Sequence, residues 1–273
     1  MFLRIGEIDV YYEVIGDGKP VVMIHGYGLD HHVMSGCMEP VFADRPGYKR
    51  IYFDLPGMGQ TRASRSISNS DKMLELIVRF IGQVIPDGTF LVAGESYGGY
   101  LARALIRLMP ERIGGAVLIC PLIVPDRPKR RLPPHMALVR DEAFLSTLSS
   151  HERENFETMA TVLDETTWEG FKRDIMPGVG LEDISFTEWF QKYGYPLSCD
   201  VDDIPPFSKP FLLFAGRQDV SVGYKDQLEI IENYPRGTFV VMDRASHSLQ
   251  IEQAEVFNVL VKEWLDRVEE SAR

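Results

Sequence analysis

The pentapeptide Gly94-Glu95-Ser96-Tyr97-Gly98 places a serine between two glycines, after an apolar run and before a stretch with helical spacing. A serine on a tight strand-to-helix turn has its hydroxyl exposed above the edge of a sheet, where it can attack a carbonyl carbon. Side chains at Gly94 and Gly98 would collide with neighbouring backbone in such a turn. The sequence therefore predicts a nucleophile elbow, with Ser96 as the nucleophile.

A serine hydroxyl needs a base to take its proton and an acid to orient that base. Asp219 follows the apolar run 211–215, and His247 follows the run 239–242, so the chain order is Ser, Asp, His. Open α/β sheets place their sites at the carboxyl ends of strands, where all three residues fall. We therefore predict a catalytic triad of Ser96, Asp219 and His247, with Asp126 as the fallback acid.

Acyl transfer also needs hydrogen-bond donors for the oxyanion that forms at the attacked carbonyl. The residue after the nucleophile, Tyr97, can supply one backbone N–H. The loop His25-Gly26-Tyr27-Gly28 follows an early strand, and its glycines let the backbone approach a ligand closely. The Tyr27 N–H is accordingly the second predicted donor, and His25 is expected to be structural.

Apolar, β-branched runs alternate with amphipathic stretches along most of the chain. The runs predict strands over residues 8–15, 21–24, 50–53, 89–93, 116–119, 211–215 and 239–242. Helical spacing predicts helices over residues 70–85, 97–109, 224–233 and 252–268. Strand–helix alternation of this kind implies an α/β fold, with a mostly parallel sheet covered by helices on both faces.

The segment 125–209 interrupts this alternation. It lacks a convincing buried strand, is bracketed by prolines, and shows short helical patterns over residues 142–148, 152–163, 167–175 and 186–193. We interpret it as a helical cap, or lid, inserted into a core domain formed by residues 1–124 and 210–273. Its large apolar residues either pack the lid or form an apolar substrate pocket; they are Met136, Phe144, Phe156, Met159, Trp168, Phe171, Trp189 and Phe190.

Composition narrows the class of partner. The chain has 273 residues, 45% of them hydrophobic, and a net charge of −11, which argues against nucleic acid or an anionic membrane as a partner. No signal peptide is visible and no apolar run approaches the ~20 residues that span a bilayer, so we expect a cytoplasmic protein. The three cysteines are odd in number and widely spaced, and they indicate neither a disulfide framework nor a zinc site.

Two short motifs stand apart from the triad. The basic run from Arg127 to Arg131 is interpreted as a solvated loop. His31 and His32 are adjacent, but no third ligand with metal spacing follows, so a surface loop is expected there. We predict no metal and no cofactor.

Five motifs in this order resemble the α/β-hydrolase superfamily over nearly the whole chain. They are His25-Gly26-Tyr27-Gly28, Asp54-Leu55-Pro56-Gly57-Met58-Gly59, Gly94-Glu95-Ser96-Tyr97-Gly98-Gly99, Gly216-Arg217-Gln218-Asp219 and the late His247. The resemblance implies an eight-stranded sheet with one antiparallel strand near its start and a helical cap over 125–209. It also implies Ser96 as nucleophile, His247 as base and Asp219 as acid. Serine at this position argues against haloalkane dehalogenases and the related epoxide hydrolases, which have Asp there.

The predicted function is a serine hydrolase that acts on a small, ester-like acyl substrate. A carbon–carbon bond hydrolase, a lactonase and an aminopeptidase are alternatives on the same machinery, the last if lid acids such as Glu142, Glu152 and Glu157 hold a substrate amine. Another alternative is a slow-turnover sensor that reports a bound small molecule to a protein partner. A non-catalytic interaction protein is disfavoured by the complete triad.

Overall fold

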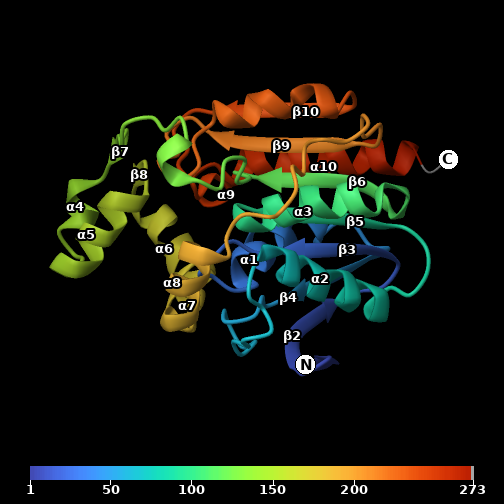
Figure 1. Cartoon of the computed structure of the whole chain (residues 1–273). Coiled ribbons are helices and arrows are strands. Elements are labelled where there is room, and N and C mark those ends of the chain that lie inside the picture. Colours follow the sequence, from blue (N-terminus) through green and yellow to red (C-terminus); the bar gives the residue numbers. More distant parts are fainter. Residues whose placement is uncertain (272–273) are drawn as a thin grey trace.

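An eight-stranded sheet runs through the centre of the computed structural model, which describes residues 1–271 (Figure 1). Its strands are β1 (Phe2–Ile5), β2 (Ile8–Ile15), β3 (Lys19–Ile24), β4 (Tyr48–Phe53), β5 (Phe90–Glu95), β6 (Ile113–Ile119), β9 (Phe211–Gly216) and β10 (Gly237–Met242). They lie in the order β1-β2-β4-β3-β5-β6-β9-β10. Within this described sheet, β2 runs in the opposite direction to the other seven strands, so its pairs with β1 and β4 are antiparallel and the remaining pairs are parallel. The predicted sheet with one antiparallel strand near its start is confirmed.

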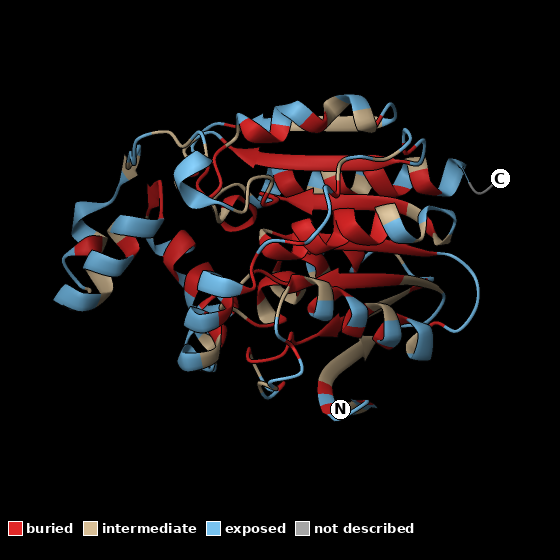
Figure 2. Ribbon diagram, viewed as in Figure 1, coloured by how far each residue is buried: buried red, intermediate tan, exposed pale blue. Residues whose placement is uncertain are grey.

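The central strands are apolar along most of their length because the sheet is covered on both faces. Every residue of β5 and β9 is buried, and β9 is red throughout in Figure 2. A strand buried on one face alternates apolar and polar residues, whereas a strand buried on both faces is continuously apolar. The short apolar runs in the sequence therefore marked the centre of the sheet correctly.

Two groups of helices cover the sheet: α1 packs against α10, and α2 packs against α3 (Figure 1). The helices of the core are α1 (His32–Phe42), α2 (Ser70–Val84), α3 (Tyr97–Leu108), α9 (Leu249–Glu252) and α10 (Ala254–Glu270), with 3-10 helices η1 (Pro110–Arg112) and η3 (Asp226–Asn233). In α2 the residues with helical spacing, from Met73 to Ile81, form the buried face, and the Asn69 side chain accepts a hydrogen bond from the Lys72 N–H at the helix start. The helices predicted over 70–85 and 97–109 are confirmed.

The segment between β6 and β9 lies at the carboxyl ends of the parallel strands, toward which the arrows of β3, β6 and β9 point in Figure 1. It contains η2 (Arg127–Lys129), β7 (Val139–Arg140), α4 (Glu142–Leu145), α5 (Ser150–Met159), β8 (Val162–Leu163), α6 (Glu165–Asp174), α7 (Met176–Val179) and α8 (Ile184–Tyr193). The four predicted helical stretches are all present. The second predicted stretch, 152–163, extends too far, because α5 ends at Met159 and residues 162–163 form β8, which pairs with β7.

Among the strands and α-helices of the core, β1, α1 and the short α9 were not predicted. Helix α1 contains Gly36 and Pro40, which disfavour helix and masked its pattern. A methyl group on Gly36 would lie 2.0 Å from a carboxylate oxygen of Asp174, so the glycine allows α6 to pack closely on α1. In the described part of the chain, no helix is both long and apolar enough to cross a membrane.

Candidate active site

Ser96 lies in a turn that joins β5 directly to α3. Its φ of 52° lies in the left-handed region that residues with a side chain rarely adopt. A methyl group on Gly94 would lie 2.4 Å from the carbonyl oxygen of Gly98, and one on Gly98 would lie 2.1 Å from the carbonyl oxygen of Ile24. The collisions expected from the sequence are therefore present, and the two glycines allow this strained turn to pack against β3.

The structure brings together the three residues that the sequence proposed as a triad. His247 Nε2 is 2.9 Å from Ser96 Oγ, and His247 Nδ1 is 2.8 Å from Asp219 Oδ2. Each residue follows the end of a strand: β5 for Ser96, β9 for Asp219 and β10 for His247. The Ser96 hydroxyl, the imidazole and the carboxylate thus form one continuous hydrogen-bonded chain.

Asp219 is fully buried and remains ionised. Burial acts to raise its pKa, but the His247 imidazole and the N–H groups of Ser221 and Val222 outweigh burial and lower the pKa below its usual value. Its Oδ1 accepts hydrogen bonds from these N–H groups at 2.7 and 3.0 Å, which leaves Oδ2 for the histidine. The fallback acid Asp126 instead forms an exposed ion pair with Lys129 at 3.0 Å.

The two predicted oxyanion donors come from two different loops, one next to Ser96 in sequence and one after β3. Tyr97 is the first residue of α3, and the first N–H groups of a helix have no acceptor within the helix. Tyr27 lies in the loop after β3, and within residues 1–271 its N–H has no backbone or side-chain acceptor. The rings of Tyr27 and Tyr97 pack edge to face, with centroids 5.4 Å apart. The role of these N–H groups as an oxyanion hole stays a prediction.

His25 supports this loop from below, as expected. It is fully buried, its Nδ1 lies 2.7 Å from the Gly26 carbonyl oxygen, and its Nε2 accepts a hydrogen bond from the Leu55 N–H at 2.9 Å. The imidazole therefore joins the loop after β3 to the loop after β4.

Glu95, directly before the nucleophile, is a second carboxylate beside the histidine that the sequence interpretation missed. Its side chain is buried and its Oε1 lies 3.3 Å from His247 Nε2, while its Oε2 has no hydrogen-bond partner in the described chain. A methyl group on Gly26 would lie 2.0 Å from Glu95 Oε2, so this glycine provides the space for the carboxylate. A charged residue at the end of an otherwise apolar buried strand was the signal in the sequence.

Glu95 and His247 each shift the pKa of the other. Burial raises the pKa of Glu95 to about 7, and the charge of Asp219 acts in the same direction, opposed by His247. Burial alone would lower the pKa of His247, but Asp219 and Glu95 outweigh it and raise the pKa to about 9. The imidazole therefore lies between two carboxylates that favour its protonated form.

Glu252, which the sequence did not single out, joins the loop of His247 to the inserted segment. One carboxylate oxygen accepts a hydrogen bond from the Ser246 N–H, next to His247. The other accepts from the N–H groups of Thr161 at 2.6 Å and Val162 at 3.1 Å. Burial raises the pKa of this carboxyl, whereas the three N–H donors act to lower it. This half-buried side chain therefore joins the loop of the histidine to β8.

A cavity of about 370 Å³, here called the triad pocket, opens at Ser96 and His247. From the apolar set predicted in the lid, Met159 and Phe171 line it. Others pack within the inserted segment: the Phe156 ring contacts those of Trp168 and Phe171, with centroids 5.1 and 5.5 Å apart. Both interpretations of the lid residues therefore apply, and Phe171 belongs to both groups.

The prediction of a solvated loop for the basic run 127–131 is wrong in part. Arg127 and Arg130 line the triad pocket, and Arg131 binds the buried Asp226 carboxylate. All three nitrogens of the half-buried Arg130 guanidinium donate to backbone carbonyl oxygens. The chain folds back against η3 here, which the local sequence does not indicate.

A surface loop at His31 and His32 is also contradicted, because His31 is 3% exposed and lies at the start of α1. Its Nδ1 is 2.8 Å from a carboxylate oxygen of Asp54, which also accepts from the His31 N–H. Ligand atoms of Asp30, His31 and His32 lie within 4.8 Å of one another. The Asp54 pair accounts for the buried imidazole, since it joins α1 to the loop after β4.

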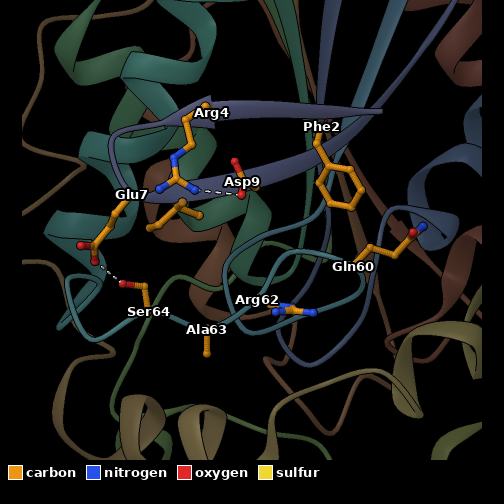
Figure 3. A pocket seen from close by; sticks show the side chains of 9 residues that line it. Phe2, Arg4, Glu7, Asp9, Gln60, Arg62, Ala63 and Ser64 are labelled. Atoms are coloured by element: carbon orange, nitrogen blue, oxygen red, sulfur yellow. Dashed lines mark hydrogen bonds and ion pairs between the residues drawn. The ribbon is translucent and has the colours of Figure 1, made fainter.

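A separate hollow of about 700 Å³ lies between the β1–β2 hairpin and the loop 60–64 (Figure 3). Three of its charged groups have local partners: Arg4 pairs with Asp9 at 2.8 Å, and Glu7 accepts from the Ser64 hydroxyl at 2.6 Å. None of the triad residues lines it. The triad pocket is therefore the cavity that has reactive groups in its wall.

Comparisons with known proteins agree with this architecture. A family model described as "alpha/beta hydrolase fold" matches residues 19–254. The crystal structure of an alpha/beta superfamily hydrolase from Oenococcus oeni is 30% identical, covers 95% of this chain and 96% of its own, and superposes with a TM-score of 0.88.

Curated relatives with named activities are more distant. A 2-hydroxy-6-oxononadienedioate/2-hydroxy-6-oxononatrienedioate hydrolase from Burkholderia vietnamiensis is 28% identical over 96% of this chain and 92% of its own length. A pimeloyl-[acyl-carrier protein] methyl ester esterase from Aeromonas hydrophila is 25% identical over 94% of this chain and 100% of its own length.

Proposed function

The chain belongs to the α/β-hydrolase fold family, and from this premise we propose that it is a serine hydrolase that cleaves a small, ester-like acyl substrate. The family and the hydrolase and esterase names of its relatives support hydrolase activity. The observation that carries the finer proposal is the hydrogen-bonded chain from Ser96 through His247 to Asp219, at the mouth of a pocket.

The proposed reaction follows from this arrangement. Ser96 Oγ attacks the substrate carbonyl carbon while His247 Nε2 takes its proton, and Asp219 holds the proton on Nδ1. The N–H groups of Tyr27 and Tyr97 bind the oxyanion. His247 then gives its proton to the leaving alcohol, which leaves an acyl group on Ser96. Water attacks the acyl-enzyme, His247 takes the water's proton, and the acid is released as Ser96 regains its hydrogen.

We propose that the inserted segment, residues 125–209, acts as the lid of this site. Its support is that α5 and α6 supply Met159 and Phe171 to the pocket that contains Ser96. These side chains make part of the wall apolar, which suits an acyl or alcohol group of small size. The substrate in this account is a small molecule, and the steps require only side chains, backbone groups and water.

A carbon–carbon bond hydrolase is the second candidate, and one relative favours it. The Burkholderia vietnamiensis enzyme is named for a substrate with a keto group and two carboxylates and no ester. A ketone carbonyl can occupy the same position beside Ser96 and the two N–H groups. The aminopeptidase alternative loses its basis, because Glu142 and Glu157 pair with Arg140 and Arg153, and Glu152 caps α5 through Ser149.

The proposal is tested by steady-state and burst kinetics with p-nitrophenyl esters from acetate to octanoate, and with an aminoacyl p-nitroanilide for comparison. Multiple turnovers on the esters, fastest at one chain length and absent on the anilide, are expected. A single burst without steady-state turnover would instead support the sensor alternative. Turnover of the anilide alone would contradict the ester proposal.

Replacing Glu95 with Gln is expected to move the acid limb of the kcat/KM profile to lower pH by about one unit. His247 must be neutral to accept the Ser96 proton, so activity rises as pH approaches the His247 pKa from below. The ionised Glu95 carboxylate favours the imidazolium and so raises that pKa, together with Asp219; Arg130 acts in the opposite direction. Removing the Glu95 charge therefore lowers the pKa.

This prediction is checked by kcat/KM measured between pH 5 and 10 for the wild type and Glu95→Gln. Glu95→Asp, which keeps the charge, is the control, and its acid limb should lie closer in pH to that of the wild type. An acid limb at the same pH in Glu95→Gln and the wild type would show that Glu95 does not act on the histidine.

A further inference from the structure

Two arginines, Arg127 and Arg130, line the triad pocket, and neither forms an ion pair with a carboxylate of the described residues. Both come from the segment that leaves β6. Among the described residues that line the pocket, the one carboxylate is Glu95, and it faces His247 at 3.3 Å. No carboxylate of residues 1–271 lies within ion-pair distance of either arginine, in a chain with 40 acidic residues.

Arg130 is held in place by neutral acceptors. Its guanidinium donates to the carbonyl oxygens of Val124 at 2.8 Å, Pro125 at 2.9 Å and Ser221 at 2.9 Å. A guanidinium has five N–H donors, so these bonds fix its plane and leave two donors for a ligand. Burial lowers its pKa, and the nearby charge of Arg127 adds to this effect. An anion in the pocket would offset both.

Arg127 has an exposed side chain with no hydrogen bond or ion pair to the rest of the described chain. The nearest acidic residue in sequence, Asp126, is engaged by Lys129 at 3.0 Å. Arg127 is near enough to Arg130 for the two positive charges to oppose each other. Like charges side by side are unfavourable unless a counter-ion lies between them or beside them.

Tyr195 adds a neutral donor to the same wall. Burial raises the pKa of this tyrosine, so its hydroxyl stays protonated; within residues 1–271 its backbone carbonyl accepts from the Ser70 hydroxyl, and its own hydroxyl has no hydrogen-bond partner. Its ring stacks on that of Tyr97, beside the nucleophile, with centroids 4.9 Å apart. Arg127, Arg130 and Tyr195 therefore present donors to one cavity, and that cavity also contains the Ser96 hydroxyl.

We propose that Arg127 and Arg130, with the Tyr195 hydroxyl, form a carboxylate-binding subsite of the triad pocket, and that the substrate is an acyl compound with a free carboxylate remote from the carbonyl that Ser96 attacks. This inference rests on the proposed serine hydrolase. A guanidinium fork matches a carboxylate in two parallel hydrogen bonds, which gives orientation as well as affinity. The carboxylate would place the reacting carbonyl at Ser96 and exclude neutral esters of the same length.

The test compares matched substrates that differ only in charge. Methyl hemiesters of dicarboxylic acids with four to eight carbons place the carboxylate on the acyl side, and acetyl esters of hydroxy acids place it on the alcohol side. In each, a carboxamide replaces the carboxylate as the neutral isostere. The wild type is expected to favour the carboxylate by about tenfold in kcat/KM at one chain length and on one side.

Arg127→Gln is expected to lower this carboxylate-to-carboxamide ratio about tenfold, and Arg127→Glu to invert it. Lys129→Gln is the matched control. It also removes one positive charge, two residues from Arg127, but the Lys129 side chain does not line the pocket. Its ratio should equal that of the wild type. Because Arg127 is exposed, raising the salt concentration should also reduce the wild-type ratio.

The outcomes separate this inference from the function on which it rests. Ser96-dependent turnover of both substrate sets with a wild-type ratio near one would overturn the subsite and leave the serine hydrolase intact. A high ratio that survives Arg127→Glu would also overturn it. If neither set is turned over, the rate of fluorophosphonate labelling at Ser96 is measured with adipate and with adipamide. Slower labelling with adipate alone supports the subsite, equal rates refute it, and no labelling refutes both proposals.

Discussion

Ser96→Ala is expected to reduce kcat for the preferred ester by about 10⁶-fold, the scale of losing the nucleophile of a triad enzyme. The substitution removes one oxygen and keeps the Cβ, so the strained turn at φ 52° is unchanged in its steric demands. His247 then has no hydroxyl at 2.9 Å from which to take a proton. Steady-state kinetics on purified protein measure the loss, and thermal unfolding shows that the variant is folded.

Ser221→Ala is the matched control for this experiment, because Ser221 also lines the triad pocket. Its hydrogen bonds to Asp219 and Arg130 use the backbone N–H and carbonyl, so they survive the substitution. Activity within a few-fold of the wild type is expected. Comparable losses in the two variants would show that the effect is not specific to Ser96.

Asp219→Asn is expected to lower kcat by about 10⁴-fold with the fold intact. The carboxylate uses Oδ1 to accept from the Ser221 and Val222 N–H groups and Oδ2 to accept from His247. An asparagine that keeps its oxygen toward the two N–H groups turns its NH₂ group toward Nδ1. The imidazole proton must then move to Nε2, where it prevents acceptance of the Ser96 proton.

Asp126→Asn provides the comparison, since Asp126, which follows β6 near the start of the lid, is the fallback acid from the sequence. It forms an exposed pair with Lys129 and should lose little activity. The kcat values of Asp126→Asn and Asp219→Asn, measured at several pH values, show which aspartate is the acid. A large loss in Asp126→Asn together with near-normal activity in Asp219→Asn would show that Asp126, and not Asp219, is the acid.

The sequence was sufficient to predict that Ser96, Asp219 and His247 lie together, because each of them is marked by a local pattern. Gly94 and Gly98 identify the elbow around Ser96, and a continuous apolar run precedes both Asp219 and His247. Parallel strands bring their carboxyl ends to one edge, so separate local signals become one site without knowledge of the packing. The same apolar runs predicted the positions of the central strands along the chain and a mostly parallel sheet.

The remaining features depend on contacts between distant segments. Arg130 is anchored by the Ser221 carbonyl oxygen across the fold, so a basic run that looks solvated in sequence becomes part of a pocket wall. Glu252 bonds to Thr161 and Val162, and His31 is buried against Asp54. Helix α1 was hidden by Gly36 and Pro40, and the reason for the glycine appears only when α6 is placed against it. Local periodicity has no signal for such pairings.

The central claim, that Ser96 is an activated nucleophile, is tested most directly by labelling the purified protein with a fluorophosphonate and locating the adduct by mass spectrometry. The account predicts one adduct per chain, on the peptide that contains Ser96. The adduct should be absent from Ser96→Ala and form much more slowly in Asp219→Asn. No adduct on the folded wild type, or an adduct on another residue that persists in Ser96→Ala, would contradict the account.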